Sequence, residues 1–535
     1  MIFNPLENFE INALSLLSTV LMIYVAYYYY KYFTRVNPLP GPFPFPIIGT
    51  FPYAVWFKGD IPKFYKYCYK KYGDIYETNN FYRCIVLCRA EYLEIFLSKN
   101  MYWMRCPNYE GLKELGLEGK GIVYNNNYKS WIFNHHFFNQ AILSPKFTNE
   151  VIDWTNELFS ELESYWDKLL LKEKISKENK IKLDLIEWFS HYTTDMINKM
   201  LTGKRSYSMA AYFNTISDEK FDNQSARVED SEKLFQSIHK IHIGYFFFFI
   251  VPPFLRHYVP FFKNIANDIL QNIGFANQKL DTIIKKRRKE IEDTSLNEPL
   301  PHDMLTSMII KNTFRDGNYI ETDEGNRSMT DSEIRVNLFD GISNGTSKIV
   351  NMLSFIIYHI AHNPNVKKKM LEEIDSIFQG KMRPITKDDF YSLKYCEAIV
   401  KEAVRIFPIV HLNTRYIDKP SEIAGYQWPA GTFFIINVGV IHNKDDYWEE
   451  PNKFNPDRWM DENFEPKKNS FIMFGEGLRL CPGRKLAMIE LVCLMALLFR
   501  KYEINLVDMN SPIKTKSDDI VISCVKLLVK IELRN

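Results

Sequence analysis

A single cysteine stands in a ten-residue loop, from Phe474 to Gly483, whose residue types could build a metal site. Glycines and a proline in this loop predict a tight turn, and residues 484–500 are apolar on nearly every face, which is typical of a buried helix. Cys481 therefore lies where a loop becomes a helix. Unpaired backbone N–H groups and the positive end of the helix dipole favour its thiolate form there. Such a thiolate is a soft, electron-rich metal ligand.

The residues Phe474, Gly477, Arg479, Cys481 and Gly483 match the haem-binding loop of the cytochrome P-450 family, so the chain resembles that family. The resemblance implies haem b as the cofactor, with its iron bound by Cys481. It implies that Phe474 shields the sulfur, that the glycines let the backbone approach the macrocycle, and that Arg479 pairs with a haem propionate. Cysteine thiolate is the haem ligand that favours O–O cleavage.

Further residues resemble positions that lie near the haem propionates in the family. Trp131 fits a helix in which the family has tryptophan and, four residues later, arginine. His135 stands at the arginine position, where it is either an ordinary surface or core histidine or a weaker, pH-dependent propionate contact. Arg415 resembles a second family residue that binds a haem propionate. The alternative is that Arg415 is an ordinary surface arginine.

The segment from 340 to 348 departs from the family pattern of an acid followed by threonine, which helps deliver protons to iron-bound dioxygen. If Thr346 is the threonine, Gly345 occupies the acid position. Counting back without gaps from Asn363, Ser347 instead replaces the acid and Lys348 the threonine, and we favour this second register. In both registers the proton relay is altered. Hydroxyl groups of Thr346 and Ser347 could order a water that substitutes for it.

The resemblance to the family, together with the altered segment from 340 to 348, leads to three hypotheses about function. The first is a haem-thiolate monooxygenase that inserts one oxygen atom from O2 into a lipophilic small molecule. The second is a haem-thiolate isomerase or dehydratase that rearranges a peroxide without O2, which the altered helix favours. The third is a non-enzymatic haem protein that binds a gas or a lipid.

A set of charged residues resembles the structural signature of the family. Glu402 and Arg405 are three residues apart, which puts them on one face of a helix, and 454–459 follows them at a family-like distance. In the family, this glutamate and arginine bond to a second arginine, here Arg458, and support the cysteine loop. The resemblance therefore implies that these three residues are structural, and that losing one of them leaves an uncompensated buried charge.

The elements that must position these residues are mainly helical, with small β-sheets, in the haem-thiolate fold that the resemblance implies. Helices are expected over 147–171, 265–291 and 391–407, and a β-hairpin over 75–87. Thr330 and Glu333 form the pattern of a capping box, which predicts the start of a long helix crossing the haem face.

Composition narrows the class of protein. The 535 residues are 46% hydrophobic and carry a formal net charge of +2, so a large core is possible and a nucleic-acid-binding role receives no support. The eight cysteines show no CxxC pair, which favours reduced thiols.

The N-terminal region predicts three parts: a membrane anchor in 1–36, a proline-rich hinge in 37–50 and a catalytic domain in 51–535. The run from Ile11 to Tyr30 has no charge and about the length of a membrane span, and Lys31 and Arg35 after it place the catalytic domain in the cytosol. The resemblance implies the endoplasmic reticulum membrane with a single-pass anchor.

The resemblance also implies a membrane-bound, NADPH-dependent reductase as the electron-donating partner. It would dock near Cys481, where four basic residues either attract it or are ordinary solvated loop charges: Lys467, Lys468, Arg484 and Lys485.

Overall fold

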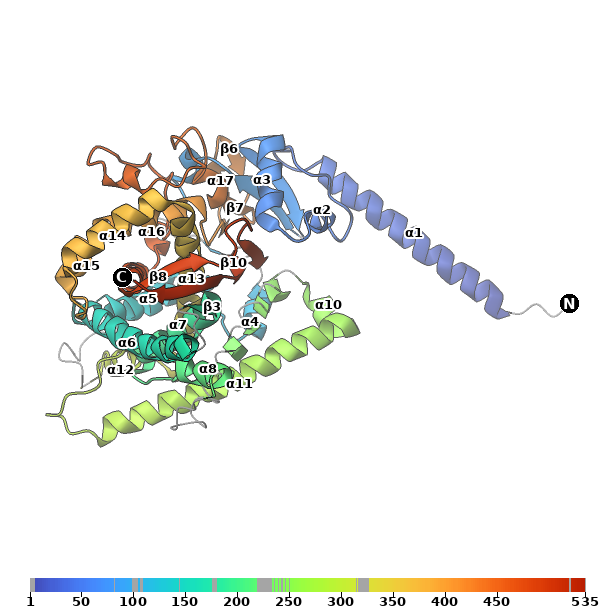
Figure 1. Cartoon of the computed structure of the whole chain (residues 1–535). Coiled ribbons are helices and arrows are strands. Elements are labelled where there is room, and N and C mark those ends of the chain that lie inside the picture. Colours follow the sequence, from blue (N-terminus) through green and yellow to red (C-terminus); the bar gives the residue numbers. More distant parts are fainter. Residues whose placement is uncertain are drawn as a thin grey trace.

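The computed structural model confirms a mainly helical chain with small sheets (Figure 1). The described residues are 5–80, 82–98, 104–105, 109–143, 145–175, 180–218, 233–234, 236–238, 240–241, 244–245, 247–249, 251–313, 315, 327–518 and 521–534.

Helices of all lengths surround one central helix, α13. In chain order they are α1 (Pro5–Phe33), α2 (Phe51–Trp56), α3 (Ile61–Tyr72), α4 (Tyr109–Glu114), α5 (Tyr128–Ile142), α6 (Pro145–Ile175), α7 (Leu185–Thr202), α8 (Ser208–Ile216), α10 (Pro253–Tyr258), α11 (Pro260–Asp293), α12 (Met304–Ile310), α13 (Asp331–His362), α14 (Pro364–Phe378), α15 (Lys387–Ser392), α16 (Lys394–Ile406), α17 (Val438–Ile441) and α18 (Arg484–Lys501), with the short 3-10 turns η1 (Ala90–Leu93), η2 (Pro456–Met460) and η3 (Gly477–Arg479).

The strands form four small sheets, ordered β1-β2-β7-β4, β3-β11-β8, β10-β9 and β5-β6. The hairpin expected over 75–87 is β1 paired antiparallel with β2, and β2 continues in parallel with β7. The strand bounds are β1 (Ile75–Asn80), β2 (Tyr82–Leu87), β3 (Ile181–Asp184), β4 (Leu412–Tyr416), β5 (Ser421–Ile423), β6 (Tyr426–Trp428), β7 (Phe433–Asn437), β8 (Tyr502–Leu506), β9 (Lys514–Asp518), β10 (Val521–Lys526) and β11 (Leu528–Leu533).

The central helix α13 begins with the expected capping box. The Thr330 side chain accepts from the backbone N–H of Glu333, and the Glu333 carboxylate accepts from the backbone N–H of Thr330. Its closest packing is against α7, where two glycines allow the helices to approach. A Cβ on Gly345 would lie 2.4 Å from Ile197 Cδ1, and one on Gly341 would lie 3.0 Å from a methyl group of Leu201. This packing fixes the rotation of α13, and therefore which side chains face the site.

The N-terminal helix α1 projects away from the rest of the protein (Figure 1). Within the described part of the chain, no helix has the length and apolar character needed to cross a membrane. The single-pass anchor expected from the sequence is thus not confirmed, and residues 1–4 of that expected segment lie outside the described residues.

The proline-rich segment after α1 is tied to the first sheet. Glu77 on β1 pairs with Arg35 at 2.6 Å and with Arg83 at 2.6 Å, and Arg83 also donates to the carbonyl oxygens of Val36 and Asn37. At Gly41 the chain runs so close to β1 that a Cβ would lie 2.1 Å from a backbone oxygen. The segment therefore holds α1 against the sheet.

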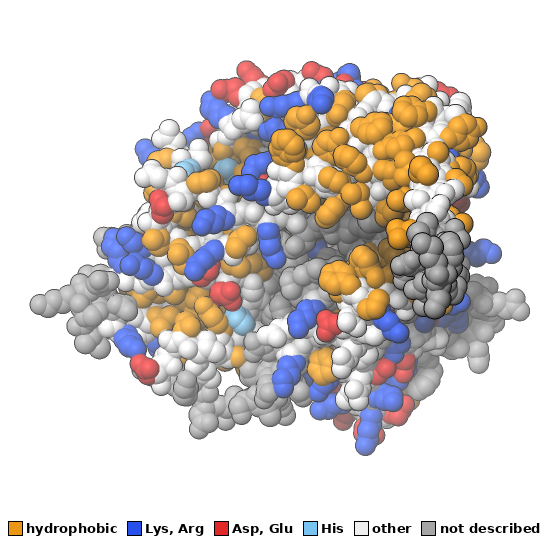
Figure 2. Space-filling model, turned by 90° about the vertical axis from the view of Figure 1, so that its right-hand side faces the viewer, with side chains coloured by type: hydrophobic (Ala, Val, Ile, Leu, Met, Phe, Trp, Pro, Cys, Tyr) orange, Lys and Arg blue, Asp and Glu red, His pale blue; other side chains and the backbone are white. Residues whose placement is uncertain are grey.

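Hydrophobic side chains gather on the face from which α1 projects (Figure 2). The exposed members of α1 and of the segment that follows it include Leu17, Leu21, Phe43, Ile47, Phe51, Val55 and Trp56. Trp56 is 83% exposed, which is unusual for the largest apolar side chain. An exposed apolar surface of this kind marks a contact with a membrane or with another protein.

Candidate functional site

An internal cavity of about 380 Å³ lies between α13, α5, α7, the loop that contains Cys481, and the start of α18. Most of its wall is apolar, and its size is within the usual range for small-molecule sites. Of the residues singled out in the sequence, the wall contains Trp131, His135, Lys348, Phe474, Arg479, Cys481 and Gly483. The structure thus brings together residues from three separate parts of the chain.

Cys481 sits three residues before α18, and its backbone N–H donates to the carbonyl oxygen of Phe474 at 3.0 Å. Burial raises the pKa of its thiol, while a hydrogen bond from the Gly483 backbone and the charges of Arg105, Arg484 and Lys348 act in the opposite direction. The expectation that the helix terminus alone favours the thiolate is therefore wrong for the metal-free chain, because desolvation is the larger effect. A coordinated metal ion deprotonates such a thiol outright.

The turn before Cys481 depends on one glycine. Gly477 has a φ of +71°, and a Cβ there would lie 2.5 Å from the carbonyl oxygen of Leu97. Gly477 does not line the cavity in the described structure, so its place is in the packing of the loop against the segment after η1. A side chain at this position would strain the backbone and push the two segments apart.

Arg105 and Arg479 line the cavity, and Arg415, which is not part of its described wall, lies close enough for both charges to act on it. Burial, together with the charges of Arg105 and Arg479, lowers the pKa of Arg415 to about 9. Arg415 donates only to neutral oxygens, those of the Asn413 side chain at 2.7 Å and the Thr414 backbone at 2.8 Å. The Nε atoms of Arg105 and Arg415 are buried without a hydrogen-bond partner. Within the described residues, Arg105 and Arg415 form no salt bridge with a carboxylate, and the Arg479 guanidinium donates to the carbonyl oxygens of Ile122 and Asn125 at 2.9 Å each.

This arginine cluster, Arg105, Arg415 and Arg479, fits an anionic ligand. Burying like charges together is costly unless an opposite charge joins them. The two propionates of haem meet this requirement, and the thiol of Cys481 in the same cavity supplies the iron ligand. Arg105 was not identified from the sequence, and no local motif marks it.

Trp131 and His135 stack on each other beside this cluster, with ring centroids 4.4 Å apart. The indole N–H of Trp131 donates to the carbonyl oxygen of Ile122 at 3.1 Å, and the Arg479 guanidinium lies 4.9 Å from the indole ring. Burial, with a contribution from Arg479, lowers the pKa of His135 to about 4. His135 is therefore neutral near pH 7, so it lacks the charge of the arginine that the family has there.

On α13, three residues had roles that the sequence left undecided, and the structure places them differently. Lys348 lines the cavity, together with Gly341, Asn344 and Gly345. Thr346 is buried, and its hydroxyl donates to the carbonyl oxygen of Ile342 at 3.1 Å. Neither Thr346 nor Ser347 belongs to the described wall of the cavity. This arrangement agrees with the ungapped register, in which Lys348 takes the position of the threonine.

Asp340 is a further site residue that sequence reasoning missed. Its Oδ2 accepts from the backbone N–H groups of Ile122 at 2.8 Å and Val123 at 3.1 Å, and burial raises its pKa to about 6. The carbonyl oxygen of Ile122 in turn accepts from Arg479 at 2.9 Å. Asp340 therefore connects α13 to the arginine cluster through a loop of four residues, Gly121 to Tyr124. Asp340, the carboxylate in the segment from 340 to 348, therefore has a structural role.

Glu402, Arg405 and Arg458 come together in a buried network outside the cavity. Glu402 and Arg405 are fully buried and form two bonds, of 2.8 and 2.9 Å. Arg458 reaches Glu402 at 3.3 Å, and the indole N–H of Trp459 donates to the same carboxylate at 2.9 Å. Arg405 also donates to the carbonyl oxygens of His442, Pro451 and Lys453. Nearly every donor and acceptor of this network is matched.

His442 joins that network to the cysteine loop. Its carbonyl oxygen accepts from Arg405 at 3.2 Å, and its ring Nε2 accepts from the backbone N–H of Ile472 at 2.9 Å, where the loop begins. Burial lowers the pKa of His442 to about 3. The ring is thus neutral, and an acceptor, throughout the physiological pH range.

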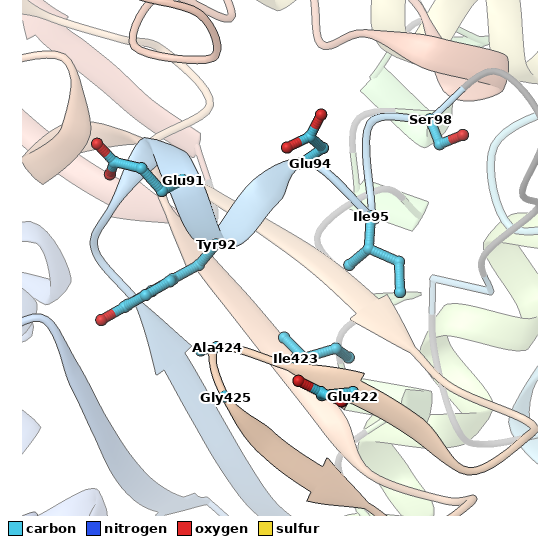
Figure 3. A pocket seen from close by; sticks show the side chains of 9 residues that line it. All are labelled: Glu91, Tyr92, Glu94, Ile95, Ser98, Glu422, Ile423, Ala424 and Gly425. Carbon is cyan, nitrogen blue, oxygen red and sulfur yellow. The ribbon is translucent and has the colours of Figure 1, made fainter.

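A second pocket, of about 580 Å³, lies on the surface between η1 and the β5–β6 hairpin (Figure 3). Ile95 and Ile423 point toward one another across it, while Glu94 points away. Glu94 pairs with Lys468 at 2.6 Å, and Glu91 pairs with Lys467 at 2.6 Å. Two of the three carboxylates that line this pocket are therefore paired with lysines, and the third, Glu422, accepts from the side chain of Gln427 at 2.8 Å.

Comparisons with known proteins agree with this geometry. A family model described as cytochrome P450 matches residues 39–532. Cytochrome P450 3A18 of Rattus norvegicus is 27% identical over 497 residues, covering 91% of this chain and 90% of that protein. Cytochrome P450 3A5 of Homo sapiens is 26% identical over 477 residues, covering 86% of each.

The fold is also similar to a solved structure. The crystal structure of the cytochrome P450DA heme domain aligns with a TM-score of 0.74 at 18% identity, covering 94% of this chain and 98% of that chain. At this identity the likeness shows the fold alone. The family model, in contrast, spans nearly the whole sequence, from the segment after α1 to β11. This protein therefore belongs to the cytochrome P450 family, whose members are haem-thiolate enzymes.

Proposed function

We propose that the protein is a monooxygenase that inserts one oxygen atom from dioxygen into a lipophilic small molecule, with electrons from a membrane-bound, NADPH-dependent reductase. The observation that carries this proposal is the apolar cavity that holds the Cys481 thiol together with Arg105 and Arg479, whose charges also act on the buried Arg415. Haem b held by Cys481 supplies the activation of dioxygen when bound. Arg105, Arg415 and Arg479 would hold its propionates.

The remaining wall would bind and orient the substrate. It is formed largely by apolar side chains of α7, α13 and the segment before β4, among them Ile197, Met200, Met352, Ile409 and Val410. Such a wall favours lipophilic molecules and excludes water from the reacting centre. Trp131 closes the side of the cavity next to the arginine cluster, where it covers the guanidinium of Arg479.

The test is the absorption spectrum of the reduced, carbon-monoxide-bound protein, for the wild type and for Cys481→Ser. We expect a strongly red-shifted Soret band in the wild type only. Reductase-dependent, oxygen-dependent oxidation of a panel of lipophilic compounds is expected next. A Soret band typical of histidine-ligated haem would contradict thiolate ligation. A thiolate spectrum without any turnover would favour a haem protein that binds a gas or a lipid.

A second candidate is a haem-thiolate isomerase or dehydratase that rearranges a lipid hydroperoxide. The specific observation in its favour is that the Thr346 hydroxyl bonds to its own helix, so α13 presents no acid and threonine pair to the cavity within the described residues. Turnover of a hydroperoxide without oxygen or reductase would support this candidate. A strict requirement for both would exclude it.

The reductase would dock near Cys481, but with fewer free charges than the sequence suggests. Lys467 and Lys468 pair with Glu91 and Glu94, as described above. Lys485 on α18 is exposed, so it is the better candidate for a contact with an acidic partner surface. Lys485→Glu should slow electron transfer from the reductase and leave the carbon monoxide spectrum unchanged.

We also propose that α1 and the exposed apolar face around it bind the endoplasmic reticulum membrane, with the catalytic domain in the cytosol. The support is the set of exposed leucines on α1 and the exposed Trp56 at the end of α2. Introducing Leu17→Asp and Leu21→Asp together should move the protein from the membrane fraction to the supernatant. Unchanged sedimentation would contradict the proposal.

A further inference from the structure

Lys348 brings an ammonium group to the wall of the cavity without a negatively charged partner. Its Nζ lies 3.2 Å from the side-chain oxygen of Asn344 and 3.4 Å from the backbone oxygen of Ser343, both neutral atoms of its own helix. Among the described residues, no carboxylate lies within salt-bridge distance of it. Of the α13 residues that line the cavity, Lys348 is the only cation.

The two carboxyl groups in the same wall do not neutralise Lys348. Asp340 is held by the backbone N–H groups of Ile122 and Val123. Burial raises the pKa of Glu490 to about 8, so this group is mainly protonated at pH 7. Burial also lowers the pKa of Lys348 to about 8, because desolvation outweighs the opposing effect of Cys481. The charge of Lys348 is therefore available to a ligand.

Lys348 is separate from the arginine cluster that fits the haem propionates. The charged group that acts on Lys348 is Cys481, whereas those that act on Arg415 are Arg105 and Arg479. Apart from Asn344, the α13 residues next to Lys348 in the wall are apolar or small, namely Gly345, Ile349 and Met352. A ligand that satisfies this part of the wall has one anionic group and a large apolar body.

We propose that Lys348 anchors the carboxylate of a lipophilic carboxylic acid, which makes such acids the preferred substrate class. The inference rests on the proposed function and deepens it. A single ammonium matches one singly charged carboxylate, while a phosphate dianion would require more donors than this part of the wall presents, since the Asn344 amide already donates to Asp340 and Ser343. The apolar wall then receives the hydrocarbon part.

The experiment compares two ligands that differ only in charge, dodecanoate and methyl dodecanoate. Both are titrated into the haem-loaded full-length protein in phosphatidylcholine nanodiscs, and binding is followed by the Soret shift and by calorimetry. The wild type should bind dodecanoate about tenfold more tightly than the ester. Lys348→Met should abolish this preference by weakening dodecanoate binding alone, and Lys348→Arg should retain most of it.

The matched control is Lys368→Met, which removes an exposed lysine on α14 whose side chain is 77% exposed. It should leave both affinities unchanged. Equal affinities for acid and ester in the wild type, or an unchanged preference in Lys348→Met, would overturn the proposal. If Lys348→Met fails to take up haem, Lys348→Gln replaces it, because the amide keeps a polar group in the wall.

The outcomes separate this inference from the proposed function. Suppose that the protein gives a thiolate-type carbon monoxide spectrum and oxidises uncharged compounds with the reductase, but Lys348→Met does not change the preference for the acid. This result would contradict only the role of Lys348. A wild type without the thiolate-type spectrum would contradict the proposed monooxygenase function. Calorimetric binding of dodecanoate would still test the anchor in that case.

Discussion

The protein holds buried charges in two regions, and they differ in how far the chain itself satisfies them. Around Glu402, two arginines, one indole N–H and one backbone N–H converge on a single carboxylate. At the cavity, Arg105, Arg415 and Arg479 lie together; Arg415 and Arg479 donate to neutral oxygens, and among the described residues Arg105 and Arg415 have no carboxylate partner. Both regions are buried, but only the first is complete in the sense that a carboxylate bonds to its arginines, whereas the second is incomplete because Arg105 and Arg415 lack one.

This difference separates a structural role from a binding role. A complete network stabilises the meander around 442–459 and, through His442, the cysteine loop. An incomplete cluster is unfavourable in the empty chain, because desolvation and mutual repulsion are not offset. It becomes favourable when an anion enters. The same types of charged residue therefore shape the fold in one region and select a ligand in the other.

Breaking the complete network should have the largest effect. Glu402→Ala leaves Arg405 buried without its partner, so we expect a loss of about 3–5 kcal/mol in the free energy of unfolding and poor haem incorporation. Urea denaturation and the haem content of the purified protein measure this. The matched control is Glu397→Ala on the same helix, which removes a surface pair with Lys401 and should cost less than about 1 kcal/mol. Equal losses in the two variants would contradict the comparison.

The link between the network and the loop should make stability depend on pH. His442 has a folded-state pKa of about 3, below its unfolded value of about 6.5. Between these values the unfolded chain binds the proton and the folded chain does not, so stability falls as the pH falls, by about 1.4 kcal/mol per pH unit. Urea midpoints at pH 7, 6 and 5 measure the slope.

His442→Gln keeps an acceptor for Ile472 but does not titrate, and it should therefore flatten this slope. The control is His136→Gln, which changes an exposed histidine whose ring bonds to the neutral side chain of Gln140. It should leave the slope nearly as in the wild type. A His442→Gln slope equal to that of the wild type would show that this ring does not control the pH dependence.

Removing a charge from the incomplete cluster should not destabilise the haem-free protein, in contrast to the loss of stability expected for Glu402→Ala. Arg415→Leu relieves an uncompensated buried charge, so we expect the haem-free protein to be unchanged or more stable by about 1 kcal/mol. The haem-loaded protein should instead lose haem about tenfold faster, which transfer to apomyoglobin measures. A haem-free Arg415→Leu protein that is much less stable than the wild type would mean that Arg415 is structural after all.

Adding a charge to the cluster should give the smallest effect. His135→Arg introduces the arginine that the family has at this position, next to Arg479 and Arg484, whose charges already lower the pKa of His135. We expect the haem-free protein to lose about 1 kcal/mol and haem to dissociate a few fold more slowly. Thermal melting with and without haem distinguishes the two effects. Faster haem loss would argue against a propionate near this position.

The parts of the fold that depend on neighbouring residues were predictable. The turn before Cys481, the capping box at Thr330 and the hairpin over 75–87 each follow from a few adjacent residues, and the structure contains all three. The thiolate preference of Cys481 was not predicted correctly, because it depends on burial by the whole cavity. Asp340 was missed because its partners belong to a loop that is distant in sequence.

The sequence by itself determined the family, the cysteine and the long helix opposite it, because these rest on local turn chemistry, capping and helical periodicity. Only the tertiary structure decided that Arg105 joins Arg415 and Arg479, since these residues meet through contacts between distant segments. It also decided that Lys348, and not Thr346, faces the cavity. The physical reason is the close packing of Gly341 and Gly345 against α7, which sets the rotation of α13.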